Sequence, residues 1–267
     1  MYLYINSKLE ISHYKFHSEK VRRDVRLAVL ADLHNCMCED GGRQLFNVID
    51  GEKPDVIVFA GDMIDASFCD PAVMQAMKLM HEHYPLIYGI GNHERKLVED
   101  RQSARVRKIF RKGLQDAGLR LLSDSYKYLS DSGIKISCLD LPVFYFRRFD
   151  QPQLDVRQIR EKLGDIDNKY FNVLIAHDPQ YFEAYSDYGS ELVLSGHMHG
   201  GVVRIPFLGG LVSPKLKLFP DYTAGLFERK ETKMIVSKGL GMHTIKVRVN
   251  NPTELVIVDI MGNRNGK

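Results

Sequence analysis

The stretch PDVIVFAGDMID, residues 54–65, decides the fold, because it joins a buried strand to a polar turn. Residues 54–60 form a short apolar run with β-branched side chains, which is typical of a strand covered on both faces. Gly61 and Asp62 follow directly, and Asp65 comes three residues later. The strand therefore ends in a tight glycine turn that presents carboxylates.

Outward from this unit, the first half of the chain alternates apolar strands with amphipathic helices. We expect strands at 25–31, 54–60 and 85–89 and helices at 43–52, 71–83 and 101–117. This order predicts a largely parallel sheet with right-handed crossovers. The second half is richer in strands and glycine, so we expect a mixed or antiparallel sheet there. Its expected strands are 134–139, 173–176, 192–194, 234–237 and 255–260, and its expected helices are 154–163 and 180–185.

Length and composition indicate one unit with an ordinary core. The chain has 267 residues, 44% of them hydrophobic, and no linker interrupts it. We therefore expect a single domain over residues 1–267, in which residues 1–23 form an N-terminal lead-in with one short strand. The formal net charge of +3 is too small to hold nucleic acid by charge alone. We expect a monomer without a specific nucleic-acid partner.

Apolar runs and cysteines bear on cellular location and redox state. No run of about 18 apolar residues is present, and the start lacks a basic segment followed by an apolar one. These features predict a protein in the cytoplasm or peripherally at a membrane, without a signal peptide or transmembrane segment. Four scattered cysteines predict reduced thiols rather than a disulfide framework.

Ligand-type side chains follow five of the expected strands. They are Asp32 and His34, Asp62 and Asp65, Asn92 and His93, His177, and His197 and His199. Because loops at the carboxyl ends of strands converge in an open α/β sheet, we expect these side chains at one site. Carboxylate, imidazole and amide groups suit zinc, manganese or iron. Asp62, behind Gly61, is the best candidate for a carboxylate that bridges two metal ions.

Together these blocks resemble the five-block signature of the calcineurin-like metallophosphoesterases. In the family's order they are Asp32-x-His34, Gly61-Asp62-x-x-Asp65, Gly91-Asn92-His93-Glu94, His177 and Gly196-His197-x-His199. The runs 199–210 and 237–259 are similar to a bacterial branch of the YkuE/YaeI type. The resemblance implies a four-layer α/β/β/α sandwich with two mixed β-sheets flanked by helices and a dimetal site at strand ends. It also implies peripheral contact with a membrane or lipid, because members of that branch are often membrane-associated.

The resemblance further implies a role for each site residue. One metal ion would take Asp32, His34, Asp62 and His199, and the other would take Asp62, Asn92, His177 and His197. His93 would stay off the metals and face the substrate. Asp65 would orient a ligand histidine, and stabilisation of a turn is its alternative role.

The expected activity is hydrolysis of a phosphate ester, which could be a phosphomonoester, a phosphodiester or a lipid-linked pyrophosphate. Two divalent ions of manganese, iron or zinc bring four positive charges, and Asp32 and Asp62 return two, so the site attracts phosphate. A hydroxide shared by the ions would attack phosphorus, because metal binding lowers the pKa of water toward about 7. A protonated His93 would stabilise the new charge or give a proton to the leaving oxygen.

Two other functions stay open: a nuclease on the same metal core, and a catalytically weak metal-binding scaffold.

Several segments also have two interpretations. Residues 143–149 form either a substrate lid or lipid contact, or a packed loop, and the basic stretch 95–112 is either a solvated surface or one that steers anions. Asn35 either touches phosphate or caps a turn, and His243 lies in a glycine-rich turn that could approach the site. Specificity is expected to depend on loops 66–71, 142–153 and 206–222.

Overall fold

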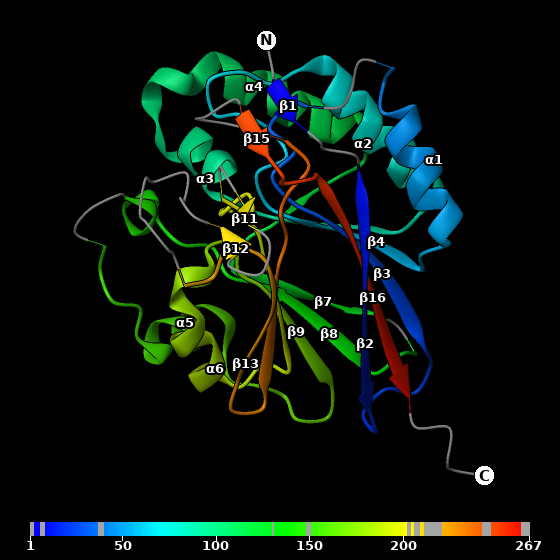
Figure 1. Cartoon of the computed structure of the whole chain (residues 1–267). Helices are drawn as coiled ribbons and strands as arrows, with labels where there is room; N and C mark the ends of the chain where they lie inside the picture. The colour runs from blue at the N-terminus through cyan, green and yellow to red at the C-terminus, as the bar shows by residue number, and fades with distance from the viewer. Residues whose placement is uncertain are drawn as a thin grey trace.

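The structure is a computed structural model that describes residues 3–5, 9–36, 40–129, 131–147, 151–201, 204–205, 209–210, 221–241 and 247–262. Two six-stranded sheets stack face to face, and helices cover the outer face of each, as Figure 1 shows. The expected four-layer α/β/β/α sandwich is therefore confirmed. Within these ranges, none of the helices has both the length and the apolar character needed to cross a bilayer.

The first sheet has the strand order β2-β16-β3-β4-β5-β6. Its strands are β2 (Glu10–Ser18), β16 (Glu254–Gly262), β3 (Val25–Leu30), β4 (Val56–Ala60), β5 (Leu86–Gly89) and β6 (Leu121–Leu122). The strands β3, β4, β5 and β6 are parallel, as the alternation with helices predicts, whereas β16 is antiparallel to β3. β2 pairs with β16 along its whole length. The segment expected as a lead-in therefore contributes an edge strand to the core sheet.

The second sheet has the strand order β13-β14-β10-β9-β8-β7. Its strands are β13 (Gly225–Arg229), β14 (Thr232–Val236), β10 (Leu192–Ser195), β9 (Phe171–Ile175), β8 (Ile134–Cys138) and β7 (Ser125–Leu129). The four inner strands are parallel, and β13 and β7 add antiparallel edges. This is the mixed sheet expected for the second half. Two short pairs are separate: β1 (Leu3–Ile5) with β15 (Val247–Val249), and β11 (Arg204–Ile205) with β12 (Gly209–Gly210).

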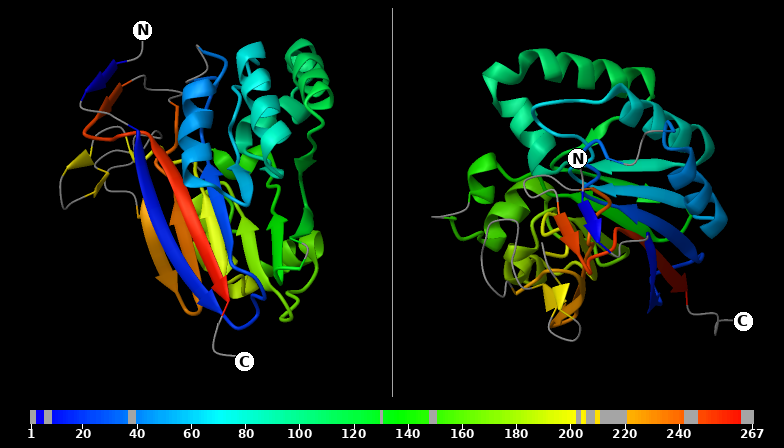
Figure 2. Two further views of the ribbon diagram at one scale, coloured as in Figure 1. Left: turned by 90° about the vertical axis from the view of Figure 1, so that its right-hand side faces the viewer. Right: turned by 45° about the horizontal axis from the view of Figure 1, so that its top comes forward.

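Helices flank the two sheets on opposite sides. On the first sheet lie α1 (Arg43–Glu52), α2 (Pro71–His83), α3 (Asn92–Glu99) and α4 (Ala104–Asp116), and on the second lie α5 (Val156–Leu163) and α6 (Phe182–Tyr188). The short 3₁₀ turns are η1 (Arg101–Ser103), η2 (Val143–Phe146) and η3 (Pro179–Tyr181). Figure 2 shows α1, α2 and α4 side by side. Helix α2 begins as the sequence predicts, because the Asp70 side chain accepts from the Ala72 N–H and Pro71 fills the first turn.

The strands direct alternate side chains into different apolar layers. In β4, Ile57 and Phe59 face the helices, whereas Val56 and Val58 face the second sheet. A third layer lies between the second sheet and helices α5 and α6. Cys36, Cys69 and Cys138 are buried within the fold.

Helix α3 is the main departure from the expected elements. The sequence analysis places no helix between the strand 85–89 and the helix 101–117, whereas the structure starts a helix at Asn92. The Glu94 carboxylate accepts a hydrogen bond from the Gly91 N–H (3.0 Å), and this capping contact begins the helix. The expected helix 101–117 is divided into η1 and α4, because Asp100 caps a separate short turn.

A close contact between the two sheets generates a prediction about stability. A Cβ atom on Gly89 would lie 2.6 Å from Ile175 Cγ2, so β5 and β9 touch through Ile175. Ile175→Ala should lower the free energy of unfolding by about 2–5 kcal/mol in urea denaturation, because a buried side chain is replaced by a cavity. The matched control, Ile11→Ala on the exposed edge strand β2, should cost about 1 kcal/mol or less. Equal losses in the free energy of unfolding for the two variants would contradict the contact between the sheets through Ile175.

Candidate metal centre

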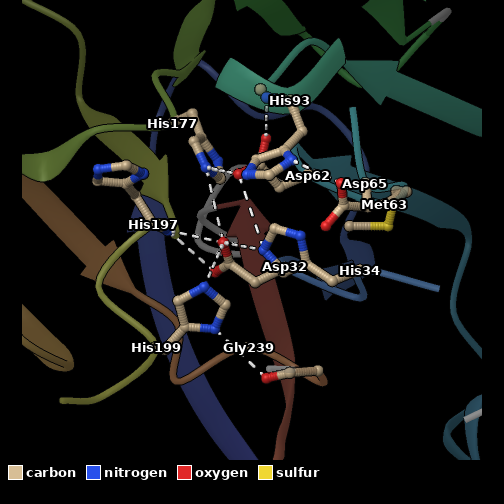
Figure 3. Close-up of polar contacts among 12 residues, drawn as sticks. Asp32, His34, Asp62, Met63, Asp65, His93, His177, His197, His199 and Gly239 are labelled. Atoms are coloured by element: carbon tan, nitrogen blue, oxygen red, sulfur yellow. Dashed lines mark hydrogen bonds and ion pairs between the residues drawn. The ribbon is translucent and has the colours of Figure 1, made fainter. Parts of the chain in front are cut away.

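The site collects side chains from five strand ends. They follow β3 (Asp32, His34), β4 (Asp62), β5 (Asn92, His93), β9 (His177) and β10 (His197, His199). Figure 3 shows the histidine rings arranged around the two aspartates. Loops of the first sheet therefore meet loops of the second, and the site spans the ends of both sheets.

Asp32, His34 and His199 form a first donor group, in which one ligand atom of each lies within 4.8 Å of the others. Asp32 Oδ1 lies 3.9 Å from His34 Nε2 and 3.7 Å from His199 Nε2. The rings of His34 and His199 stack with centroids 5.0 Å apart. These N–O distances are too long for hydrogen bonds, but they suit donors that surround a common cation.

Asp62, His177 and His197 form a second donor group. His177 Nε2 lies 3.0 Å from Asp62 Oδ2 and 3.6 Å from Asp32 Oδ1, so this imidazole joins the two groups. Beside them, the buried Asn92 Oδ1 has no hydrogen-bond partner among the described residues. A buried amide oxygen without a partner costs free energy unless a ligand completes it. The donors present therefore fit a cation.

His93 lies against both groups. Its ring packs edge-on to the His34 ring at 4.7 Å, and it forms a third donor group with His34 and Asp62. Its Nδ1 accepts a hydrogen bond from the Ala66 N–H (3.1 Å), so its proton lies on Nε2. Asp65 Oδ1 is 3.9 Å from the same Nδ1 and accepts from the Ser67 N–H (2.8 Å). Asp65 thus closes a turn beside His93, and its orienting role stays a prediction.

Backbone carbonyls orient two of the imidazoles. His177 Nδ1 lies 2.7 Å from the Ala60 carbonyl oxygen, and His199 Nδ1 lies 3.3 Å from the Gly241 carbonyl oxygen. Each carbonyl can only accept, so Nδ1 carries the proton. Nε2 of each ring is thereby turned toward the carboxylates, as in metal-binding histidines.

The backbone at the site is held in an uncommon conformation. Five ligand-type residues have positive φ: Asp32 (52°), His34 (46°), Asp62 (58°), His197 (68°) and His199 (50°). Such values are uncommon for residues other than glycine, and they cluster at functional sites. Glycines permit the close approach: a Cβ atom on Gly91 would lie 2.3 Å from Asp62 Oδ1, and one on Gly196 would lie 2.5 Å from Asp32 Oδ2.

Burial and neighbouring charges shift the pKa values in the site. Burial raises the pKa of Asp32 to about 7, against the opposing effect of His177. Burial would also raise the pKa of Asp62, but His177 and His93 outweigh it and hold that pKa well below its usual value. Burial would lower the pKa of His177, but Asp62 and Asp32 raise it to about 10. Positive partners therefore stabilise the charged form of Asp62, whereas burial disfavours the charged form of Asp32.

Glu94 holds the Asp62 turn, a role that the sequence did not reveal although the residue stands in the third block. It is fully buried, and its carboxylate accepts from the backbone N–H groups of Asp62 (2.9 Å) and Met63 (2.8 Å). The Tyr88 hydroxyl donates a further hydrogen bond of 2.7 Å. The first turn of α3 is therefore tied to the turn after β4, and this contact fixes the position of the proposed bridging carboxylate.

A second missed contribution comes from the C-terminal part of the chain. Arg248 is buried, and its Nη2 donates to the carbonyl oxygens of Lys238 (2.8 Å) and Gly241 (2.6 Å). The same segment touches the first donor group, because the Gly241 N–H donates to the Asp32 carbonyl oxygen (2.7 Å). A lone arginine in a strand-like run carries no such signal in the sequence. The glycines at 239 and 241 are the features that could have pointed to a close approach of this segment.

Other expectations have mixed outcomes. The Asn35 side chain donates to the Phe68 carbonyl oxygen (2.9 Å) and accepts from the Asp70 N–H (3.0 Å), so it ties down the loop before α2. Residues 143–147 form η2 and the start of a loop beside α3. His243, residues 148–150 and most of the loop 206–222 lie outside the described residues.

Comparison with known proteins gives a consistent result. Residues 25–201 match the family described as calcineurin-like phosphoesterase. The chain is 26% identical to the metallophosphoesterase YkuE of Bacillus subtilis, over 78% of this chain and 68% of YkuE. It is 22% identical to the phosphodiesterase YaeI of Escherichia coli, over 79% and 72% of the two chains. It is 24% identical to the UDP-2,3-diacylglucosamine pyrophosphatase LpxG of Chlamydia trachomatis, over 54% of this chain and 42% of LpxG.

The Glu94 contacts generate a prediction. Glu94→Gln replaces an accepting oxygen with an NH₂ group that faces backbone donors, so it should lower the free energy of unfolding by roughly 1–3 kcal/mol. It should also weaken metal binding, because the Asp62 turn loses its support. Urea denaturation and metal analysis measure the two effects. Glu99→Gln on the same helix is the control, since that carboxylate pairs with Arg95 at the surface; an equal loss in both variants would contradict the assigned role.

Metal binding should release protons. The pKa of His177 is raised to about 10, so its imidazole is protonated at neutral pH until a cation displaces the proton from Nε2. Metal affinity should therefore increase as the pH rises toward about 10. Calorimetric titration with manganese in buffers of different ionisation enthalpy measures the protons released. An affinity independent of pH, with no proton release, would contradict this account.

Proposed function

The chain belongs to the calcineurin-like phosphoesterase family and is therefore a phosphoesterase; from this premise we propose that it hydrolyses a phosphate ester with two divalent metal ions that share Asp62. The observation that carries the proposal is the position of His177 Nε2, 3.0 Å from Asp62 and 3.6 Å from Asp32. Two donor groups meet at this imidazole, and both contain a buried carboxylate. Paired buried carboxylates of this kind require cationic partners.

We assign the donors to two ions. One ion would take Asp32, His34, Asp62 and His199, and the other would take Asp62, Asn92, His177 and His197. When bound, such ions supply a water of lowered pKa and hold the phosphate oxygens. The two ions carry four positive charges against two negative charges from Asp32 and Asp62, so the site attracts an anionic substrate.

His93 is proposed to act on the leaving group. Its Nδ1 is occupied by the Ala66 N–H, so Nε2 is the atom that can donate a hydrogen bond to the leaving oxygen. Asp65 Oδ1 lies beside the ring, 3.9 Å from Nδ1. His93 thus assists departure without occupying a metal position.

The names of two relatives bear on the substrate. YaeI is named a phosphodiesterase and LpxG a pyrophosphatase. In both kinds of substrate, two of the oxygens on the attacked phosphorus are bonded to further groups. We propose a diester or a pyrophosphate, including a lipid-linked one, ahead of a simple monoester. Contact with a lipid surface, a single domain and a monomeric state stay predictions.

A direct test compares p-nitrophenyl phosphate with bis-p-nitrophenyl phosphate in the presence of manganese. The proposal expects turnover, with the diester hydrolysed faster. Failure to turn over either ester by protein that has bound its metals would favour the scaffold alternative.

His93→Ala separates the leaving-group role from metal binding. We expect turnover to fall by about 10²–10⁴, the usual size of acid–base catalysis, while both metals remain bound. Metal analysis and steady-state kinetics measure the two quantities, and His13→Ala, at an exposed position of β2, is the control. Loss of metal together with activity would show that His93 is a ligand instead.

A further inference from the structure

We propose that a cavity beside the metal centre binds the leaving group of the substrate, and that Lys96 and Arg147 select a leaving group with its own negative charge. This inference rests on the proposed hydrolysis of a phosphate ester. The cavity has a volume of about 300 Å³, and its lining includes Asp65, Asn92, His93, Lys96, Phe146 and Arg147. It therefore adjoins the metal centre on the side of Asn92 and His93.

One wall of the cavity is the face of α3. Asn92 and Lys96 are four residues apart, so their side chains lie on one side of the helix. His93 belongs to the same wall and carries its proton on Nε2. A leaving oxygen bound to that proton therefore directs its substituent into the cavity, where Lys96 contributes a positive charge.

A second wall of the cavity is η2, which hydrogen bonds and a ring contact hold in place. The Tyr181 hydroxyl donates to the Tyr145 carbonyl oxygen (2.7 Å), and the Tyr145 hydroxyl accepts from Gln158 (2.9 Å). The Phe146 ring lies edge-on to the His197 ring at 5.5 Å. Arg147, the next residue, is thereby placed next to the metal centre.

The charge of the lining favours an anion. In the part of the chain that the structure describes, neither Lys96 nor Arg147 forms an ion pair, whereas Arg95 pairs with Glu99 and Asp140. The acid in the lining, Asp65, already accepts from Ser67. Two cations against one acid leave a net positive charge, and Phe146 adds an apolar surface. The matching leaving group has a carboxylate or phosphate on an apolar or aromatic skeleton.

A pair of substrates of equal shape tests this selection. The esters 4-carboxyphenyl phosphate and 4-carbamoylphenyl phosphate differ in the charge of the leaving group, and their methyl diesters serve if the enzyme acts on diesters. We expect the manganese-loaded protein to prefer the carboxylate by about three- to tenfold in kcat/KM, mainly through KM. The preference should decrease with added salt, since both cations are exposed.

Variants connect the preference to the two cations. Lys96→Gln and Arg147→Gln should each reduce the ratio, and the double variant should bring it to the ratio set by the two leaving groups alone. Lys108→Gln and Arg105→Gln, which remove exposed cations from α4, should keep the wild-type ratio. A ratio that persists in the double variant, or no preference for the carboxylate in the wild type, would overturn the inference.

Binding separates this inference from the hydrolytic proposal. The analogues 4-carboxybenzyl phosphonate and 4-carbamoylbenzyl phosphonate are not hydrolysed, so calorimetry on the manganese-loaded protein reports affinity alone. Tighter binding of the carboxylate that the double variant abolishes would support the cavity assignment even if no ester were turned over. Equal affinities would refute the assignment even if hydrolysis were observed.

Discussion

The structure depends on holding two buried carboxylates, Asp32 and Asp62, beside one imidazole. Both side chains are almost fully buried, and His177 Nε2 lies within 3.6 Å of an oxygen of each. Like charges in a site of low dielectric are unfavourable unless positive partners lie between them. The histidines meet part of this need, and divalent ions at the two donor groups would meet the rest.

This arrangement restricts the backbone around it. Several site residues adopt positive φ, and Gly91 and Gly196 leave the space that the aspartates occupy. Such conformations persist when surrounding contacts hold them. Glu94 provides those contacts for the Asp62 turn, and Arg248 provides them for the segment behind Asp32. The three apolar layers hold in place the strands from which both segments extend.

The sequence predicts the parts of the molecule that local patterns control. Helix 71–83 is found where expected, because Asp70 and Pro71 mark its start, and the strand-end residues converge because parallel strands end at one edge. Other features depend on residues far apart in the chain. A short strand was expected within residues 1–23, but the place of β2 in the core sheet was not recognised because its partner is β16, at the other end of the sequence. The roles of Glu94 and Arg248 were missed because their partners are backbone groups of other loops.

Anomalous diffraction from crystals grown with manganese would show whether two metal ions share Asp62. We expect two anomalous peaks about 3.5–4 Å apart, one next to Asp32 and His199 and the other next to His177, with the Asp62 carboxylate between them. A single peak, or peaks away from Asp62, would show that Asp62 does not bridge two ions.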